Sequence, residues 1–189
     1  MGIVSSVANG VLTTVCRAVP DRAGRAPYNP AVATPPARHK ALFARFVEGP
    51  ALIRASLDGV TAGALNQRPP GEEWSIRDLV IAATDAELLL AVRVRLMLTG
   101  DADPLPSLDE TAARRRLQYL WRDVDAAMAL LSLTRFTTAE LLSHVDAAGW
   151  ERTGPGEGGA VTIAALVDAA TRESEELAAR IAAIRSRAN

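Results

Sequence analysis

Side chains that commonly bind metals or act as nucleophiles are scarce in this chain. Its only histidines are His39 and His144, and its only cysteine is Cys16. A catalytic zinc site commonly uses three protein ligands, often all histidines, and one copy of this chain does not contain three. A single cysteine also excludes an internal disulfide, so a reducing, cytoplasmic setting is expected.

Carboxylates are the other candidates for chemistry. Glu173 falls on the inward-facing stripe of an amphipathic segment, where a lone carboxylate is costly unless an arginine or a bound cation satisfies it. Glu173 with Asp85 or Glu87 could form an acid–base pair. Asp85 and Glu87 could line a pocket mouth, although the favoured prediction is that both lie on the helix surface, paired with arginines. The arginines considered are Arg77, Arg93 and Arg95.

The charge balance argues against nucleic-acid binding. Twenty-one Lys and Arg oppose 22 Asp and Glu, a formal net charge of −1, whereas nucleic-acid recognition usually needs a basic face. Acids flank the basic run at residues 114–116, which is expected to be solvated. The sequence also lacks the ~20 uninterrupted apolar residues of a spanning helix and the basic start of a signal peptide. We therefore predict a cytoplasmic protein that binds neither nucleic acid nor membrane.

Apolar residues recur every three or four positions along most of the chain beyond residue 36, as in amphipathic helices. Gly49-Pro50 is expected to interrupt the first helix, and Ser75 with Asp78 forms a capping-box pattern at the start of the second. Residues 149–159 are expected to form a glycine-rich loop, and no stretch alternates like a β-strand. The predicted helices cover residues 37–57, 75–99, 107–145 with a restart at Thr137, and 162–184.

Long amphipathic helices joined by compact loops predict an all-α four-helix bundle at residues 37–187. Prolines crowd the preceding stretch and no apolar face repeats there, so residues 1–36 are predicted to be a flexible or irregular N-terminal arm. His39 is expected to be solvated, and Trp121 is expected on the buried stripe of the third helix. Trp74 could form a pocket wall, although a plug at the bundle end is favoured.

Several short motifs occur in the order found in the DinB/YfiT-like family. Residues 73–77, Glu-Trp-Ser-Ile-Arg, resemble the family's most recognisable phrase, and residues 85–87, Asp-Ala-Glu, resemble part of its second helix. Residues 57–60 and 150–154 resemble the exit from its first helix and the loop before its last helix. The resemblance covers about residues 41–184, and it implies a four-helix bundle in up-down-down-up order.

In that family, three histidines hold a divalent metal such as nickel or zinc. One histidine lies on the second helix and two, four residues apart, lie on the last, because residues at that spacing share a helical face. The matching positions here are Ala82, Glu173 and Leu177, and a gap would move the second pair to Arg172 and Glu176. Neither alignment supplies an imidazole. The resemblance therefore implies that the usual metal site is lost, and we expect no metal cofactor.

Three interpretations of this region remain open. The site could have become core, with Leu177 filling the space of an ion. It could be a pocket kept for a small-molecule ligand, or it could belong to a metal-dependent or thiol-dependent transferase or hydrolase with a relocated or carboxylate site. We favour the first two, a non-catalytic binding or scaffolding module, and the resemblance implies a homodimer. A filled contact between Ala82 and Leu177 would argue against an enzyme. The pocket candidates are Trp74, Ala82, Asp85, Glu87, Glu173 and Leu177.

Overall fold

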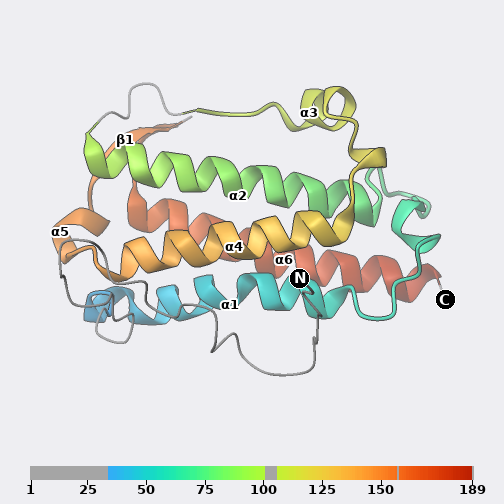
Figure 1. Cartoon of the computed structure of the whole chain (residues 1–189), viewed down its shortest axis with the longest axis horizontal. Helices are drawn as coiled ribbons and strands as arrows, with labels where there is room; N and C mark the ends of the chain where they lie inside the picture. The colour runs from blue at the N-terminus through green and yellow to red at the C-terminus, as the bar shows by residue number, and fades with distance from the viewer. Residues whose placement is uncertain (1–33, 101–105, 157, 189) are drawn as a thin grey trace, which may run out of the picture. The chain divides into compact units, whose positions relative to one another are not determined.

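The apolar stripes of the sequence pack against one another in a bundle of four long helices (Figure 1). The structure is a computed structural model that describes residues 34–100, 106–156 and 158–188. The predicted arm lies outside this part of the chain except for residues 34–36. The long helices are α1 (Lys40–Ser56), α2 (Ile76–Thr99), α4 (Val124–Ser143) and α6 (Ile163–Ala188). The shorter helical elements are η2 (Ala37–His39), η3 (Ala64–Asn66), α3 (Glu110–Arg116), η4 (Tyr119–Trp121) and α5 (Ala147–Trp150).

Helix packing follows a closed ring. The most extensive contacts join α1 with α6 and α2 with α4, while α1 also packs on α4 and α2 on α6. Helices α2 and α4 run in the same direction, and the segment that connects them crosses back over α2 (Figure 1). This is the predicted up-down-down-up bundle. The fully buried core side chains include Phe46, Ile53, Val80, Ile81, Val94, Met128, Leu142, Trp150, Val167 and Ile181.

Helix α2 begins and ends as its sequence predicts. The Ser75 hydroxyl oxygen accepts a hydrogen bond from the Asp78 amide, and the Asp78 carboxylate accepts one from the Ser75 amide, both at 3.1 Å. This capping box satisfies two amides that a helix start leaves unpaired. Gly100 ends the helix in the left-handed region at a φ of 89°, where glycine is favoured.

The third predicted helix is broken, which corrects the expectation of one element from Ser107. Gln118 adopts a φ of 52°, and α4 starts only after Asp123, whose carboxylate accepts from the Ala126 amide at 2.7 Å. Thr137 lies inside α4 and restarts nothing. Trp121 lies in the connecting turn with 80% of its surface exposed, so its predicted burial was wrong. The break lets the chain cross the bundle before α4 begins.

Two further local predictions were wrong. The glycine-rich segment contains an antiparallel hairpin of β1 (Thr153–Gly156) and β2 (Gly159–Thr162), with Thr153 opposite Thr162. His39 is buried, because its ring stacks on Trp150 with centroids 4.6 Å apart. The prediction that His39 is solvated was therefore wrong. No helix in the described ranges is long and apolar enough to cross a membrane.

Helix α1 continues through Gly49-Pro50, where the sequence predicted an interruption. Proline has no amide hydrogen to donate and its ring crowds the carbonyl four residues earlier, which here belongs to Phe46. The guanidinium of Arg135 replaces the missing donor, with its Nη1 atom 2.7 Å from the Phe46 carbonyl oxygen. Gly49 leaves room for this approach. The Arg135 side chain of α4 therefore supplies the hydrogen bond to the Phe46 carbonyl that Pro50 cannot donate.

We predict that Gly49→Ala destabilises the protein. An added Cβ would lie 2.9 Å from both Arg135 Nη1 and Ser174 Oγ, and overpacking of this kind costs about 1–3 kcal/mol, more than the gain of about 1 kcal/mol in helix propensity. Urea denaturation measures the change in unfolding free energy. Gly63→Ala is the control, since its nearest neighbour atom lies 4.0 Å away and its φ is −67°. Equal stability of the two variants would contradict the close approach.

Candidate functional site

A cavity of about 840 Å³ lies between α2 and α6, within the range of roughly 300–1,000 Å³ that is usual for small-molecule sites. One side of it is lined by the crossover, the segment that connects α2 with α4, through Ser107, Leu108, Glu110 and Thr111. Side chains of α1 and α4 line its floor. Apolar parts of the lining come from Ile53, Leu79, Leu89, Leu90, Leu131, Leu166 and Leu177.

Short side chains keep this space open. Ala82, Ala83 and Ala86 line the cavity from α2, and Ala169 and Ala170 line it from α6. A methyl group reaches far less distance across a helix interface than a leucine side chain, so the alanines that line the cavity leave room between α2 and α6. The cavity is therefore built into the residue types of both helices.

Five of the six pocket candidates line the cavity, and one does not. Leu177 is partly buried and packs against the core, beside an open space. Trp74 is half-buried, and the Arg114 guanidinium lies 5.1 Å from its ring centroid, so Trp74 forms part of a wall. The candidates that line the cavity are Trp74, Ala82, Glu87, Glu173 and Leu177, and Asp85 lies elsewhere.

Asp85 belongs to a separate buried network. The Tyr119 hydroxyl donates to its carboxylate at 2.8 Å, and Arg122 Nη1 lies 2.9 Å from the same group. Burial, and next the hydrogen bond to Asp85, raise the pKa of Tyr119 well above its ordinary value. The predicted surface position was therefore wrong, and the partner arginine comes from the crossover. This network fastens η4 to α2.

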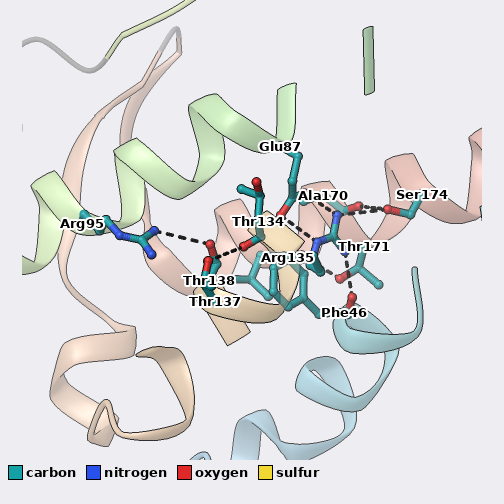
Figure 2. Close-up of polar contacts among 11 residues, drawn as sticks. Phe46, Glu87, Arg95, Thr134, Arg135, Thr137, Thr138, Ala170, Thr171 and Ser174 are labelled. Carbon is teal, nitrogen blue, oxygen red and sulfur yellow. Dashed lines mark hydrogen bonds and ion pairs between the residues drawn. The ribbon is translucent and has the colours of Figure 1, made fainter. Parts of the chain in front are cut away.

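Glu87 is also buried, again contrary to the favoured prediction. Its carboxylate forms a two-pronged ion pair with Arg135 of α4, whose Nε and Nη2 atoms lie 2.9 and 2.6 Å from its two oxygens (Figure 2). Arg135 also donates to Ser174 Oγ at 3.2 Å, and its guanidinium lies 4.0 Å from the Phe46 ring centroid. Glu87 and Arg135 are 3% and 4% exposed. This pair forms a charged but internally satisfied part of the pocket floor.

Arg135 was missed by sequence reasoning, although a signal existed. It continues the buried stripe of α4 four residues after Leu131, at a position where an apolar residue would be expected. A buried arginine needs several acceptors, and one of them is the Phe46 carbonyl, which Pro50 leaves without an amide donor. The buried arginine in α4 and the Gly49-Pro50 pair in α1 are complementary, but only the folded structure shows that they lie in contact.

Glu173 lines the cavity but, unlike Asp85 and Glu87, it is exposed to solvent, which corrects the expectation of an inward-facing position. It has no ion-pair partner among the described residues, while Glu110 and Glu176 also line the cavity. Its side chain is reached by solvent, yet partial burial, followed by the charges of Glu110 and Glu176, raises its pKa above the ordinary value of 4.5. Arg135 and Arg172 lower the pKa of Glu173, each by less than either of the two acids raises it.

The arginines that line the cavity are engaged elsewhere. Arg93 Nε donates to the Pro106 carbonyl at 2.7 Å, which holds the crossover against α2. Arg180 lies 2.9 Å from Glu72. Neither guanidinium contributes appreciably to the pKa of Glu173. At Glu173 the acids Glu110 and Glu176 therefore outweigh the arginines Arg135 and Arg172.

The donor set does not fit the metal that the family resemblance implies. Ala82 and Leu177 have no side-chain atom that could coordinate an ion. Within residues 34–100, 106–156 and 158–188, no three His, Cys, Asp or Glu side chains converge as metal ligands would. The described residues thus provide a polar pocket without a recognisable metal centre.

We predict that Glu87→Gln lowers the free energy of unfolding by about 3–5 kcal/mol, because removing one partner of a buried ion pair leaves the other charge unpaired. Urea denaturation measures the effect. The control is Arg172→Ala, which breaks the exposed pair between Arg172 and Asp168 and should cost at most about 1 kcal/mol. Similar losses in both variants would contradict the burial of the Glu87 pair.

We predict that Glu173→Gln becomes more stable than the parent as pH rises. A folded-state pKa raised above 4.5 means that the folded protein holds the proton more tightly than the unfolded chain does. The parent therefore loses stability as pH rises through that raised pKa, and glutamine removes the loss. Urea titrations from acidic to neutral pH follow the difference.

Glu175→Gln is the matched control for this pH dependence. Its hydrogen bond with Arg45 lowers the pKa of Glu175, so this carboxylate adds stability above the ordinary pKa and loses it as pH falls through the lowered one. Glu175→Gln should therefore be less stable than the parent at neutral pH, opposite in sign to Glu173→Gln. Differences of the same sign would refute the assignment for Glu173.

Comparisons with known proteins agree with this fold. No curated protein matches the chain. A solved structure of YfiT from Bacillus subtilis matches with a TM-score of 0.75 at 18% identity, covering 85% of this chain and 93% of that one. That protein is described as a probable metal-dependent hydrolase with an unusual four-helix bundle topology; at this identity the likeness shows the fold alone. The profile of the DinB superfamily matches residues 45–184, so the chain belongs to the DinB superfamily.

Proposed function

We propose that this chain is a non-catalytic binding protein of the DinB superfamily, which takes a small organic molecule into the pocket between α2 and α6. The observation that carries this proposal is an open cavity of about 840 Å³ at the place where the family resemblance implies a metal site. The positions implied for the ligands are Ala82, Glu173 and Leu177.

The shape of the cavity supports binding over a filled core. If the site had become core, larger apolar side chains would occupy the space, since burial of apolar surface contributes about 25 cal/mol per Å². The facing alanines of α2 and α6 leave it open instead. A polar floor held rigid by the Glu87–Arg135 pair beside an apolar wall is the usual composition of a small-molecule site.

An enzyme that uses carboxylates is the second candidate. Its support is Glu173, which faces the cavity with a raised pKa, as general acids often do. The partners considered for it argue against this candidate. Asp85 lies in another network, and both oxygens of Glu87 accept hydrogen bonds from Arg135, so neither is placed to exchange a proton with a substrate beside Glu173.

We also propose that the protein acts in the cytoplasm as a homodimer. Its single cysteine supports the cytoplasmic setting, and the family resemblance supports the homodimer. The metal-dependent hydrolysis named for YfiT is not part of this proposal, because Ala82 and Leu177 cannot replace metal ligands.

A fragment screen of the tag-free full chain by ligand-observed NMR tests the proposal. We expect bound fragments that are lost in Ala82→Trp, since an indole at this position would project into the cavity and obstruct it. Ala129→Trp is the control, because Ala129 is exposed on α4 and does not line the cavity. Fragments that bind Ala82→Trp as well as the parent would contradict the proposed pocket.

Metal binding is measured on the same preparations. A ligand that binds only the folded state raises the melting temperature with its occupancy, so added nickel or zinc should leave the melting temperature unchanged, and the purified protein should hold no stoichiometric metal. About one metal per chain with a raised melting temperature would instead favour a metal-dependent enzyme.

A further inference from the structure

We propose that the pocket selects an organic cation, with an ammonium group beside Glu173 and an apolar body along the leucine and alanine wall. This inference rests on the proposed function, because it names the ligand class of the same pocket. It follows from how each charged side chain of the cavity lining is used.

The charges of the lining do not balance around Glu173. Glu87 and Arg135 neutralise each other. Arg180 is paired with Glu72, which also pairs with Arg187. Glu173 therefore faces the cavity without a cation of its own, and Glu110 and Glu176 line the same cavity.

The remaining arginine of the lining, Arg93, also has a partner of its own. Its guanidinium donates to the Pro106 carbonyl. Among the described residues, no arginine of the cavity lining is therefore paired with Glu173.

A bound ammonium group would relieve two costs at this place. Like charges repel Glu173, and partial burial disfavours its ionised form. A cation in contact with the carboxylate offsets both, and the contact is strengthened where surrounding protein excludes water. An anionic ligand would add a further like charge, so the same surroundings discriminate against it.

The apolar wall specifies the rest of the ligand. Leu79, Leu131 and Leu177 line the cavity together with the alanines of α2 and α6, and such a surface is best covered by an aliphatic or aromatic body. A metal ion would leave this wall in water and would meet too few converging ligands in the described residues. The lining thus fits an amphipathic amine better than an inorganic cation.

Three probes that share one apolar body test the inference: 4-phenylbutylamine, 4-phenylbutanol and 4-phenylbutanoate. Isothermal titration calorimetry of the full chain at neutral pH should give an affinity for the amine at least about tenfold higher than for the alcohol. The carboxylate should bind more weakly than the alcohol. Because this series uses the unaltered protein, it does not depend on the folding of any variant.

Substitutions then test whether Glu173 is responsible for the preference for the amine. Glu173→Gln should weaken amine binding about tenfold and leave alcohol binding unchanged, whereas Glu175→Gln should change neither. Glu175 lies on the same helix but pairs with Arg45 outside the cavity. An unchanged amine affinity in Glu173→Gln would overturn the role of this carboxylate.

The outcomes separate this inference from the proposed function. Equal affinities for amine and alcohol, lost together in Ala82→Trp, would overturn the cation preference and leave the pocket intact. Tighter binding of the carboxylate would overturn the preference in the same way. If none of the three probes binds and the fragment screen is also empty, both the preference and the pocket fail.

Discussion

A single buried guanidinium ties all four helices together. Arg135 of α4 pairs with Glu87 of α2, donates to the Phe46 carbonyl of α1 and contacts Ser174 of α6. A buried charge is tolerated only when its donors are satisfied, so the helices must keep the axial and rotational positions that bring these acceptors together. Apolar packing provides most of the driving force, but apolar contacts alone permit many registers. The Arg135 cluster selects one of them.

The same cluster determines what the pocket offers to a ligand. The charges of its floor satisfy each other, so the floor is rigid and has little attraction left for an outside ion. Glu173 lies next to Ser174 in sequence, yet it turns to the cavity and stays outside the cluster. The structure therefore separates a structural ion pair from an unpaired carboxylate within one site. In our proposal only the second recognises the ligand, and the charge preference that we infer for the pocket follows from this separation.

The sequence predicted what depends on local physics and failed where distant residues meet. The capping box at Ser75 and the glycine end of α2 are local, and both predictions held. The Gly49-Pro50 pair looked like an interruption because its repair comes from Arg135, 86 positions away from Gly49 by sequence number. Asp85 looked like a surface acid for the same reason. Its partners lie on a crossover whose path over α2 no periodicity could reveal.

The chain shares the four-helix bundle of its superfamily, and the resemblance implies that Ala82 and Leu177 stand where histidines would bind a metal. A four-helix bundle needs buried stripes, caps and one consistent register, and none of these requires histidine at Ala82 or Leu177. Function resides in the side chains that face the cavity, and these can change while the bundle persists. Had the space lost its use, enlargement of any facing alanine would have added apolar burial. Alanines on both α2 and α6 line this cavity together with Glu173, which supports the proposal that the cavity receives a ligand whose charge Glu173 selects.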